Sequence, residues 1–479
     1  MKIAMASSEA APLAKTGGLA DVVHALSREL VRMKNEVIIV LPYYDSIRQK
    51  SQYKMEHVTS FPVYLSWRNQ TCIVFKTEIE GIQYYLLENQ QYFGRDSLYG
   101  YDDDHERFAF FCLAFRTLLK EIQFKADIVH VHDWQASMIP VLIKEQNKED
   151  DFFRSMRFVL TIHNPAFQGM CSPDILGDYY SLDYSIYTNG NVRFHEAMST
   201  LKAGIIYADK ITTVSKTHAE ELLSREGGHG LDTVMELRRG DFIGIVNGID
   251  YDEFNPATDT HIASTYNRVT FKKGKEMNKK ALFQKLHIQD EGKPLFTIVS
   301  RLTSQKGLDL VLYALRPLLE MHANVVILGS GERYFEQEFE KIRAEYPSLM
   351  AIYIGYNDEL AHQIYAASDV FLMPSLFEPC GIGQLIALRY GALPLVRMVG
   401  GLNDTVVPYI LDNRKDANGF GFYAYHATAL FDTMKWAMQC FEDPALIRTL
   451  RKNAMASLND WRQSAKAYLE VYRAACTKA

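Results

Sequence analysis

The chain has 479 residues, of which 48% are hydrophobic, and chains of this length divide into more than one domain, so we expect two domains of similar size. A formal net charge of −6 excludes the broad basic face that nucleic-acid binding requires. The six cysteines are scattered, without the close pairs of metal sites or small disulfide scaffolds, which is typical of proteins in a reducing compartment.

The chain starts with a strand pattern rather than a targeting signal. Met1 leads directly into the apolar run of residues 3–7, which leaves no room for the charged, apolar and cleavage regions of a signal peptide. No later segment has the apolar length needed to span a bilayer. The sequence therefore predicts a cytoplasmic protein without a membrane partner.

In the first half, short apolar runs alternate with helical patterns, which indicates parallel strands joined by crossover helices. The expected strands are residues 3–7, 37–41, 128–132, 158–162 and 211–214. The clearest helix lies between residues 19 and 33, where apolar residues follow the 3.6-residue period of an amphipathic helix.

The same alternation continues in the second half. The expected strands are residues 296–299, 325–328, 352–354, 370–373 and 393–396, and the expected helices are 427–441, 444–458 and 462–476. Between the halves, residues 243–250 contain Gly and Asn residues suited to a crossover and hinge. We therefore expect an α/β protein with domains at residues 1–245 and 246–459, and a C-terminal helix, about residues 460–479, that packs back on the first domain.

The segment Lys15, Thr16, Gly17 and Gly18 lies between the first strand and the clearest helix. Glycines there let backbone N–H groups approach an anion at the positive end of the helix, and Lys15 adds a charge. A plain strand-to-helix turn explains the segment equally well. The spacing of a Walker loop is absent.

Two cations, Arg301 and Lys306, follow the expected strand of residues 296–299 and precede a helix. They lie at the carboxyl end of a parallel strand, where open α/β sheets bind their ligands. The planar fork of Arg and the mobile charge of Lys suit a diphosphate. We favour this interpretation over a solvated helix start.

A further candidate segment, from Met373 to Gln384, again follows an apolar strand. Glu378 can accept hydrogen bonds from sugar hydroxyls, and Gly381 and Gly383 leave backbone amides accessible before the next helix. A glutamate before a proline is also common in surface turns, so Glu378 alone is a weak signal.

Histidines follow two strands of the first half. His163 and Asn164 come after the strand that ends at residue 162, where a histidine can bind a substrate hydroxyl or cap a helix. For His130 we favour a core position. His132 and Asp133 lack a third ligand at a supporting spacing, so we expect no metal site.

Two further patterns have simple structural explanations. Gly329 and Gly331 match only half of a dinucleotide fingerprint, so an NAD-dependent dehydrogenase is the weakest interpretation of the chain. Five lysines cluster around an expected helix start: Lys272, Lys273, Lys275, Lys279 and Lys280. Such a run is usually a solvated face, but it can also add positive potential near a phosphate site.

Taken in chain order, these segments resemble the bacterial glycogen synthases and plant starch synthases. The matching segments are residues 15–21, 132–134, 161–164, 246–250, 300–307, 378–381 and 400–405, which span most of the chain. These relatives are retaining, ADP-glucose-dependent transferases of the GT-B fold. The resemblance therefore implies two Rossmann-like domains facing across a central cleft.

The resemblance assigns the nucleotide-sugar donor mainly to the second domain. It implies that Arg301 and Lys306 clamp the pyrophosphate and that Glu378 orients the transferred glucose. Tyr356 matches the position that stacks on adenine. The other donor-domain contacts implied are Asn247, Cys380, Gly381 and Gly383. Gly383 departs from the family pattern, because many relatives carry threonine there, and a backbone contact is expected to replace the hydroxyl.

The first domain supplies the remaining contacts implied by the resemblance. Lys15 with Thr16, Gly17 and Gly18 is expected to reach the donor phosphates, and His163 to lie near the reacting side of the sugar, with Asn164 as a sugar contact. Asp21, Asp133 and Trp134 are expected to shape the acceptor side.

The implied reaction transfers an α-glucosyl group from ADP-glucose to the non-reducing 4-hydroxyl of an α-1,4-glucan, glycogen or a malto-oligosaccharide, with retention of configuration. No second carboxylate stands out as a partner of Glu378, so we expect a same-face transfer assisted by the leaving phosphate. ADP-glucose is a co-substrate, and no cofactor or metal is expected.

Two alternatives remain open: a UDP-sugar-dependent retaining GT-B transferase, and a non-catalytic glucan-binding homologue. An aromatic platform such as Tyr356 would stack on uracil too, so the preference for ADP-glucose comes from the resemblance. A glucan phosphorylase is disfavoured, because the chain is far shorter than that family and shows no match to its pyridoxal-phosphate lysine.

Overall fold

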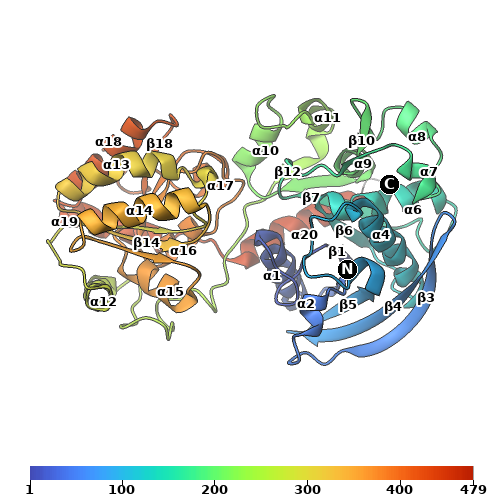
Figure 1. Cartoon of the computed structure of the whole chain (residues 1–479), viewed down its shortest axis with the longest axis horizontal. Coiled ribbons are helices and arrows are strands. Elements are labelled where there is room, and N and C mark those ends of the chain that lie inside the picture. Colours follow the sequence, from blue (N-terminus) through green and yellow to red (C-terminus); the bar gives the residue numbers. More distant parts are fainter. Residues whose placement is uncertain (478–479) are drawn as a thin grey trace. The chain divides into compact units, whose positions relative to one another are not determined.

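The computed structural model describes residues 1–477 and forms two compact units. The first contains Met1–Ile245 and the chain from Trp461 onward, and the second contains Val246–Asp460 (Figure 1). One detail of the expected crossover is wrong: residues 243 and 244 belong to strand β12 (Phe242–Gly244), which pairs in parallel with β11 (Lys210–Thr213).

The first unit is built on a nine-stranded sheet in the order β12-β11-β7-β6-β1-β2-β5-β4-β3. Its other strands are β1 (Lys2–Ala6), β2 (Glu36–Pro42), β3 (Glu56–Leu65), β4 (Arg68–Ile79), β5 (Ile82–Glu88), β6 (Ile128–His132) and β7 (Arg157–Ile162). Neighbours from β12 to β5 run parallel, and β5, β4 and β3 form an antiparallel ribbon. The five strands expected in this half are confirmed, whereas the ribbon was not expected.

The helices of the first unit connect these strands. They are α1 (Gly18–Arg32), α2 (Asp45–Arg48), α3 (Gln90–Phe93), α4 (Asp104–Glu121), α5 (Asp133–Ala136), α6 (Met138–Gln146), α7 (Ile175–Asp178), α8 (Ser185–Thr188), α9 (Thr200–Tyr207), α10 (Lys216–Leu222), α11 (Asp232–Leu237), the 3-10 helix η1 (Arg239–Asp241) and α20 (Trp461–Thr477). A small antiparallel sheet has the order β8 (Met170–Cys171), β10 (Ala197–Ser199), β9 (Arg193–Phe194). Helix α20 packs against α1 and β7, so the end of the described chain belongs to the core of the first unit.

The second unit is a parallel six-stranded sheet in the order β15-β14-β13-β16-β17-β18. The strands are β13 (Leu295–Val299), β14 (Asn324–Gly329), β15 (Met350–Ile354), β16 (Val370–Met373), β17 (Leu393–Arg397) and β18 (Phe420–Phe422). The helices are α12 (Phe271–Leu286), η2 (Ser304–Lys306), α13 (Leu308–Glu320), α14 (Arg333–Glu345), α15 (Asp358–Ala367), α16 (Gly383–Arg389), α17 (Gly400–Thr405), α18 (Ala427–Cys440) and α19 (Pro444–Ala454). The five strands expected in this half are confirmed. Of the expected helices, α18 and α20 match closely, whereas α19 ends at Ala454, four residues before the predicted end at residue 458.

Both faces of this sheet are buried, which explains why its strands are almost wholly apolar. Successive side chains point to opposite faces, so Phe296 and Ile298 join the core under α13, α14 and α18, while Leu295 joins the core under α12 and α15. Figure 1 shows these two helix layers above and below the sheet. The carboxyl ends of the strands are thereby left to the loops.

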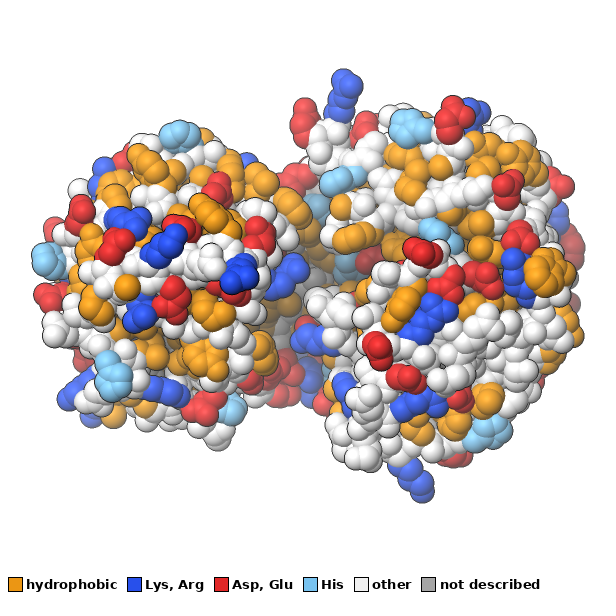
Figure 2. Space-filling view, in the orientation of Figure 1, with side chains coloured by type: hydrophobic (Ala, Val, Ile, Leu, Met, Phe, Trp, Pro, Cys, Tyr) orange, Lys and Arg blue, Asp and Glu red, His pale blue; other side chains and the backbone are white. Residues whose placement is uncertain are grey.

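The outer surface carries charges of both signs. On the face shown in Figure 2, Lys and Arg side chains are interspersed with Asp and Glu over both units. Among residues 1–477, no helix combines the length and apolar character needed to cross a membrane.

Candidate active site

The loop between β1 and α1 is held by Glu9, a residue that the sequence patterns did not single out. One carboxylate oxygen of this buried side chain accepts the backbone N–H of Thr16 at 2.5 Å and that of Gly17 at 3.3 Å. The other accepts the hydroxyls of Thr16 at 2.6 Å and Tyr99 at 2.7 Å. A single buried carboxylate therefore accepts four hydrogen bonds, three from the loop and one from Tyr99.

Part of the same loop, around Gly17 and Gly18, is accessible to a ligand. Lys15 Nζ lies 2.8 Å from Asp21 Oδ1, so the structure joins two residues that were expected to serve different substrates. A Cβ added at Gly17 or Gly18 would meet no heavy atom within 4 Å. The start of α1 can therefore be approached by an anion, as the phosphate interpretation requires.

His130 lies in the core, as predicted. Its ring nitrogens are 2.8 Å from the Tyr472 hydroxyl of α20 and 2.6 Å from Thr161 Oγ1. Burial, with a smaller contribution from His163, lowers the pKa of His130 to about 3. This imidazole is therefore neutral at pH 7 and joins α20 to the sheet.

His132 and His163 form a neutral pair at the carboxyl ends of β6 and β7. His132 Nδ1 lies 3.0 Å from His163 Nε2, while His132 Nε2 is buried without a hydrogen-bond partner among the described residues. Burial lowers the pKa of His163 to about 3, and burial with repulsion from His130 and His163 places the pKa of His132 well below its usual value. Neither ring carries a charge at pH 7, so each offers one donor and one acceptor.

Asp133 contacts the backbone of this histidine pair. Its backbone φ is +54°, a left-handed conformation, and Oδ1 accepts the backbone N–H of His163 at 2.7 Å. Burial raises the pKa of Asp133 to about 7, against the opposing backbone hydrogen bonds from His163 and Asn164. The carboxyl group therefore positions the start of the loop after β7.

Trp134 and Asn164 have structural contacts of their own. The Trp134 ring packs edge-on against Phe108 with centroids 5.2 Å apart, and a Cβ at Gly169 would press on its indole. Asn164 Oδ1 accepts the backbone N–H of Ala166 at 3.1 Å and closes a turn. Both side chains are only partly buried, so each also presents atoms to solvent.

In the second unit, Lys306 and Glu378 are in direct contact. Lys306 Nζ lies 2.6 Å from Glu378 Oε2, and Ser375 Oγ donates to the same oxygen at 3.0 Å. The side chains are 17% and 8% exposed, so the pair is largely shielded from water. A Cβ at Gly307, where φ is +69°, would overlap the carbonyl oxygen of Pro374, so glycine is required for the two loops to meet.

Arg301 differs from Lys306 because its exposed guanidinium forms no hydrogen bond or ion pair with the described residues. Gly329 and Gly331 lie against this loop: a Cβ at either would overlap the carbonyl oxygens of Ser300 or Leu302. Close packing therefore explains the half dinucleotide fingerprint. It also holds Arg301 at the end of β13.

The loop that carries Glu378 rests on a pair of glycines. Gly401 donates its backbone N–H to Glu378 O at 3.1 Å, and a Cβ at Gly400 would overlap the same oxygen. Gly381 adopts a φ of +76°. Burial raises the pKa of Cys380 to about 12, so this residue is a neutral thiol. Gly400 and Gly401, the first two residues of the motif of residues 400–405, thus shape the loop that carries Glu378.

Gly383 has a steric explanation. An added Cβ would lie 3.0 Å from the Phe371 ring, which is tighter than an ordinary contact. A side chain at position 383 would therefore require Phe371 to move by a few tenths of an ångström. The departure from the family pattern is therefore tied to a core residue of β16.

Asn247 and Tyr356 complete the set of expected residues in this unit. Asn247 is 5% exposed, and its Oδ1 has no hydrogen-bond partner among the described residues. Tyr356 follows the edge strand β15, is 86% exposed, and donates its hydroxyl to Asp358 Oδ1 at 3.1 Å. Most of this side chain therefore lies in solvent.

Comparison with known proteins tests the resemblance directly. The family model for the starch synthase catalytic domain matches residues 2–237, and the model for glycosyl transferases group 1 matches residues 278–454. The glycogen synthase of Clostridium kluyveri is 44% identical over 475 residues, which cover 98% of this chain and 99% of that protein. The chain belongs to the glycogen synthase family. The glycogen synthase of Geobacillus stearothermophilus is 42% identical over 473 residues, covering 98% of this chain and 97% of the relative.

Solved structures agree with this assignment. The catalytic domain of starch synthase IV from Arabidopsis thaliana, bound to ADP and acarbose, has a TM-score of 0.90 and 33% identity, covering 99% of both chains. Sucrose-phosphate synthase from Thermosynechococcus elongatus, at 16% identity and a TM-score of 0.61 over 99% of this chain and 98% of its own, shares the fold. This member of the glycogen synthase family is thus a glycosyltransferase with the GT-B fold, and the predicted family, fold class and activity are confirmed.

Proposed function

We propose that this glycogen synthase family member transfers an α-glucosyl group from ADP-glucose to the non-reducing 4-hydroxyl of an α-1,4-glucan, with retention of configuration. The observation that carries the proposal is the Lys306–Glu378 pair, 2.6 Å apart, on loops that follow β13 and β16. The first of these loops also carries Arg301, whose side chain has no partner among residues 1–477. Two cations suit a diphosphate, and a carboxylate suits sugar hydroxyls. The starch synthase IV structure with ADP and acarbose supports a nucleotide and a glucan as ligands.

The second unit is proposed to hold the donor. Arg301 and Lys306 bind the pyrophosphate and neutralise the charge that grows on the leaving ADP. Glu378 orients the glucose, and its contact with Lys306 keeps sugar and phosphate sites in a fixed relation. Tyr356 stacks on the base. Further substrate contacts proposed are Asn247, Cys380, Gly381 and the backbone of Gly383.

The first unit is proposed to serve the acceptor and to add donor contacts. Lys15, Thr16, Gly17 and Gly18 contact the donor phosphates through one side-chain charge and the open N–H groups of the loop. His163, neutral at pH 7, offers a hydrogen bond near the reacting sugar. Asn164 is proposed as a further sugar contact, and the residues proposed on the acceptor side are Asp21, Asp133 and Trp134.

In the proposed mechanism, the bond from the anomeric carbon to the phosphate oxygen breaks while the acceptor 4-oxygen attacks from the same face. The acceptor proton passes to the departing phosphate, so the residues supply position and charge rather than a covalent intermediate. ADP-glucose is consumed as a co-substrate, and the proposal needs no resident cofactor or metal. We also propose a cytoplasmic location, in line with six cysteines that form no disulfide, and no nucleic-acid or membrane partner.

The test is incorporation of labelled glucose into glycogen, with ADP-glucose and UDP-glucose supplied side by side. Faster incorporation from ADP-glucose is expected. Faster incorporation from UDP-glucose would favour the UDP-sugar alternative. Glycogen binding without incorporation from either donor would favour a non-catalytic homologue, and a Glu378→Gln variant provides the inactive control.

A further inference from the structure

A cavity of about 760 Å³ lies in the second unit at the amino ends of its strands. Pro294, directly before β13, and Asp369, directly before β16, line it. Arg301, Lys306 and Glu378 follow the carboxyl ends of the same strands, about 16 Å away along a five-residue strand. The cavity is therefore separate from the proposed active site, and no step of the proposed transfer uses it.

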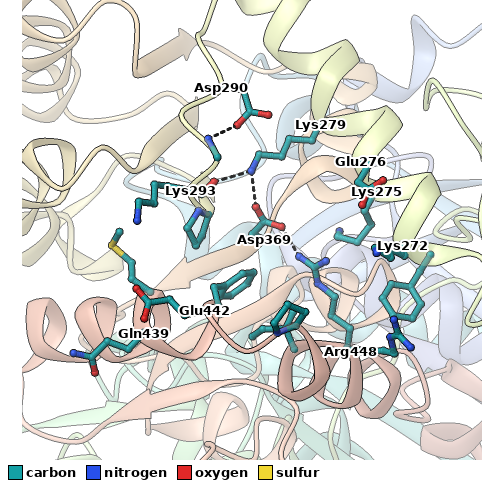
Figure 3. A pocket seen from close by; sticks show the side chains of 18 of the residues that line it. Lys272, Lys275, Glu276, Lys279, Asp290, Lys293, Asp369, Gln439, Glu442 and Arg448 are labelled. Atoms are coloured by element: carbon teal, nitrogen blue, oxygen red, sulfur yellow. Dashed lines mark hydrogen bonds and ion pairs between the residues drawn. The ribbon is translucent and has the colours of Figure 1, made fainter.

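Two helices present cations to this cavity (Figure 3). Lys272, Lys275 and Lys279 occur at a spacing of three and four residues, which places them on one face of α12. Arg448 and Arg451 are three residues apart on α19. The sequence cluster of lysines is thus divided: three of its members line the cavity, and Lys273 and Lys280 do not.

The cavity has an excess of positive groups. Seven of its lining residues are Lys or Arg and four are Asp or Glu, in a chain whose net charge is negative. Asp369 is the buried acid: Lys279 Nζ lies 3.0 Å from it, and Arg451 contacts its other oxygen. Although burial opposes ionisation, these two cations lower the pKa of Asp369 to about 2, so one carboxylate faces two positive charges.

Several of these cationic side chains have N–H groups that are not engaged within the described residues. The side chains of Lys272, Lys293 and Arg448 form no hydrogen bond or ion pair with the described residues, and Arg451 Nε is buried without a partner. Lys275 is different, because its Nζ donates to the carbonyl oxygens of Ala366 at 3.0 Å and Tyr390 at 3.1 Å. Lys275 thus supports the wall of the cavity, whereas Lys272, Lys293 and Arg448 are available to a ligand.

The remaining lining is apolar, and the free cations are spread around it. Phe271, Phe441, Pro444 and Ile447 provide apolar walls. Figure 3 shows Lys272 and Lys293 on opposite sides of the opening. The volume falls within the range of small-molecule pockets. Separated cations with apolar walls between them suit a carbon skeleton that carries an anionic group at each end.

We propose that this cavity binds a small organic bisphosphate, with one phosphate held by Lys272 and Arg448 and the other by Lys293. Charge-assisted hydrogen bonds from Lys and Arg are the strongest that a protein offers to phosphate. The hydrophobic side chains cover the carbon skeleton between the two groups. This site goes beyond the proposed function and does not depend on it.

The experiment is calorimetric titration of the full chain with fructose 1,6-bisphosphate at fixed ionic strength, with and without saturating ADP. We expect one molecule bound per chain under both conditions. Substituting both Lys272→Gln and Arg448→Gln is expected to weaken binding by about tenfold or more. Lys273→Gln combined with Lys280→Gln, which removes two charges from exposed positions of α12 outside the cavity, is the matched control and is expected to leave binding within about twofold.

Four results would overturn the proposal. The first is no heat of binding, and the second is binding that ADP abolishes, which would place the ligand in the donor site. The third is equal weakening by the Lys273→Gln/Lys280→Gln control, which would indicate a general charge effect. The fourth is binding of inorganic pyrophosphate as tight as that of the sugar bisphosphate, which would assign the cavity to an inorganic anion.

Discussion

At the scale of single residues, the two cations of the second unit differ in what they must give up to bind a phosphate. Arg301 is exposed and unpartnered among the described residues, so it binds without losing an internal contact. Lys306 is held by Glu378 at 2.6 Å and has two further protons to donate. Lys306 can therefore bridge carboxylate and phosphate, whereas Arg301 meets the phosphate alone.

We predict that Arg301→Gln and Lys306→Gln each slow glucosyl transfer by about tenfold to a few hundredfold at saturating donor, because each removes a charge-assisted hydrogen bond worth about 1.5–3 kcal/mol. Only Lys306→Gln should also lower the free energy of unfolding, since it leaves the Glu378 carboxylate buried without its cation. The measurements are turnover and denaturant unfolding. Lys341→Gln, on the surface of α14, is the control. Near-normal turnover in both variants would contradict the clamp.

Glu9 carries the second residue-scale prediction. Glu9→Gln replaces one accepting oxygen by a donor, so it cannot satisfy the N–H groups and hydroxyls that now converge on the carboxylate. We expect faster amide hydrogen exchange at residues 15–18 and a several-fold higher KM for the donor. Tyr99→Phe removes only one of the four bonds and should have a smaller effect. Unchanged exchange at these amides would show that Glu9 does not order the loop.

At the scale of elements, buried strands were predicted from the sequence more accurately than partly exposed ones. Strands β6 and β16 begin and end at the predicted residues. β16 is a continuous apolar run with clear limits, and β6 is fully buried although it contains His130 and His132. The β3–β5 ribbon escaped prediction because it is antiparallel and partly exposed, so charged and polar residues interrupt its pattern. Its strands therefore lack the signal that marked the others.

The same distinction applies to the candidate site. Motif positions identified Arg301, Lys306 and Glu378, but the contact between the last two depends on β13 lying next to β16, and no local pattern fixes that order. Glu9 was missed because a single glutamate after a strand does not reveal that its carboxylate is buried. Long-range pairing and burial are the information that the sequence patterns lack.

The lowered pKa values of the histidines in β6 and after β7 imply that the stability of the folded chain decreases at acidic pH. The pKa values of His130 and His163 are about 3 in the folded chain, so these rings stay neutral while the unfolded chain takes up protons below about pH 6.5. Their contribution to stability is complete above pH 6.5 and falls as the pH approaches 3, by about 1.4 kcal/mol per pH unit for each ring. Asp133 has the opposite effect on stability, because its raised pKa of about 7 lets the folded chain take up a proton before the unfolded chain does. This proton uptake offsets the destabilisation that one histidine ring causes.

We therefore expect the free energy of unfolding to decrease steadily between pH 6.5 and pH 4, measured by urea unfolding at several pH values. His163→Gln should reduce this slope by about one proton. A stability that does not vary over this interval would show that the buried rings take up protons in the folded chain.

The close approach of Gly383 in α16 to Phe371 in β16 predicts that substitutions at these two positions have non-additive effects on stability. In Gly383→Thr, the new Cβ would lie 3.0 Å from the Phe371 ring, and we expect a loss of about 1–3 kcal/mol in stability from overpacking. Phe371→Leu in the same chain should recover part of this loss, because it removes the ring edge that the threonine meets. Thermal unfolding of the two single variants and the double variant measures the coupling. Additive losses would contradict the steric explanation.

At the scale of the whole molecule, the two units have separate hydrophobic cores. The core of the first unit includes Tyr468 and Tyr472 of α20, although more than two hundred residues of the second unit precede that helix in the chain. The second unit has its own clusters on both faces of its sheet. Each unit therefore has the interior that cooperative unfolding requires, and the loss of α20 would disturb the first unit alone.

The final prediction follows from these separate cores and from the proposed donor residues. Scanning calorimetry should resolve two unfolding transitions, one for each unit. ADP at about one hundred times its dissociation constant should stabilise one transition by about 2.7 kcal/mol. Because Arg301, Lys306 and Glu378 all lie in the second unit, that transition should be the one that moves, and Arg301→Gln should reduce its shift. Tyr472→Phe removes the hydroxyl that pairs with His130, so it should lower the other transition and thereby identify it. If ADP moved the transition that Tyr472→Phe lowers, the main contacts to the nucleotide would belong to the first unit instead.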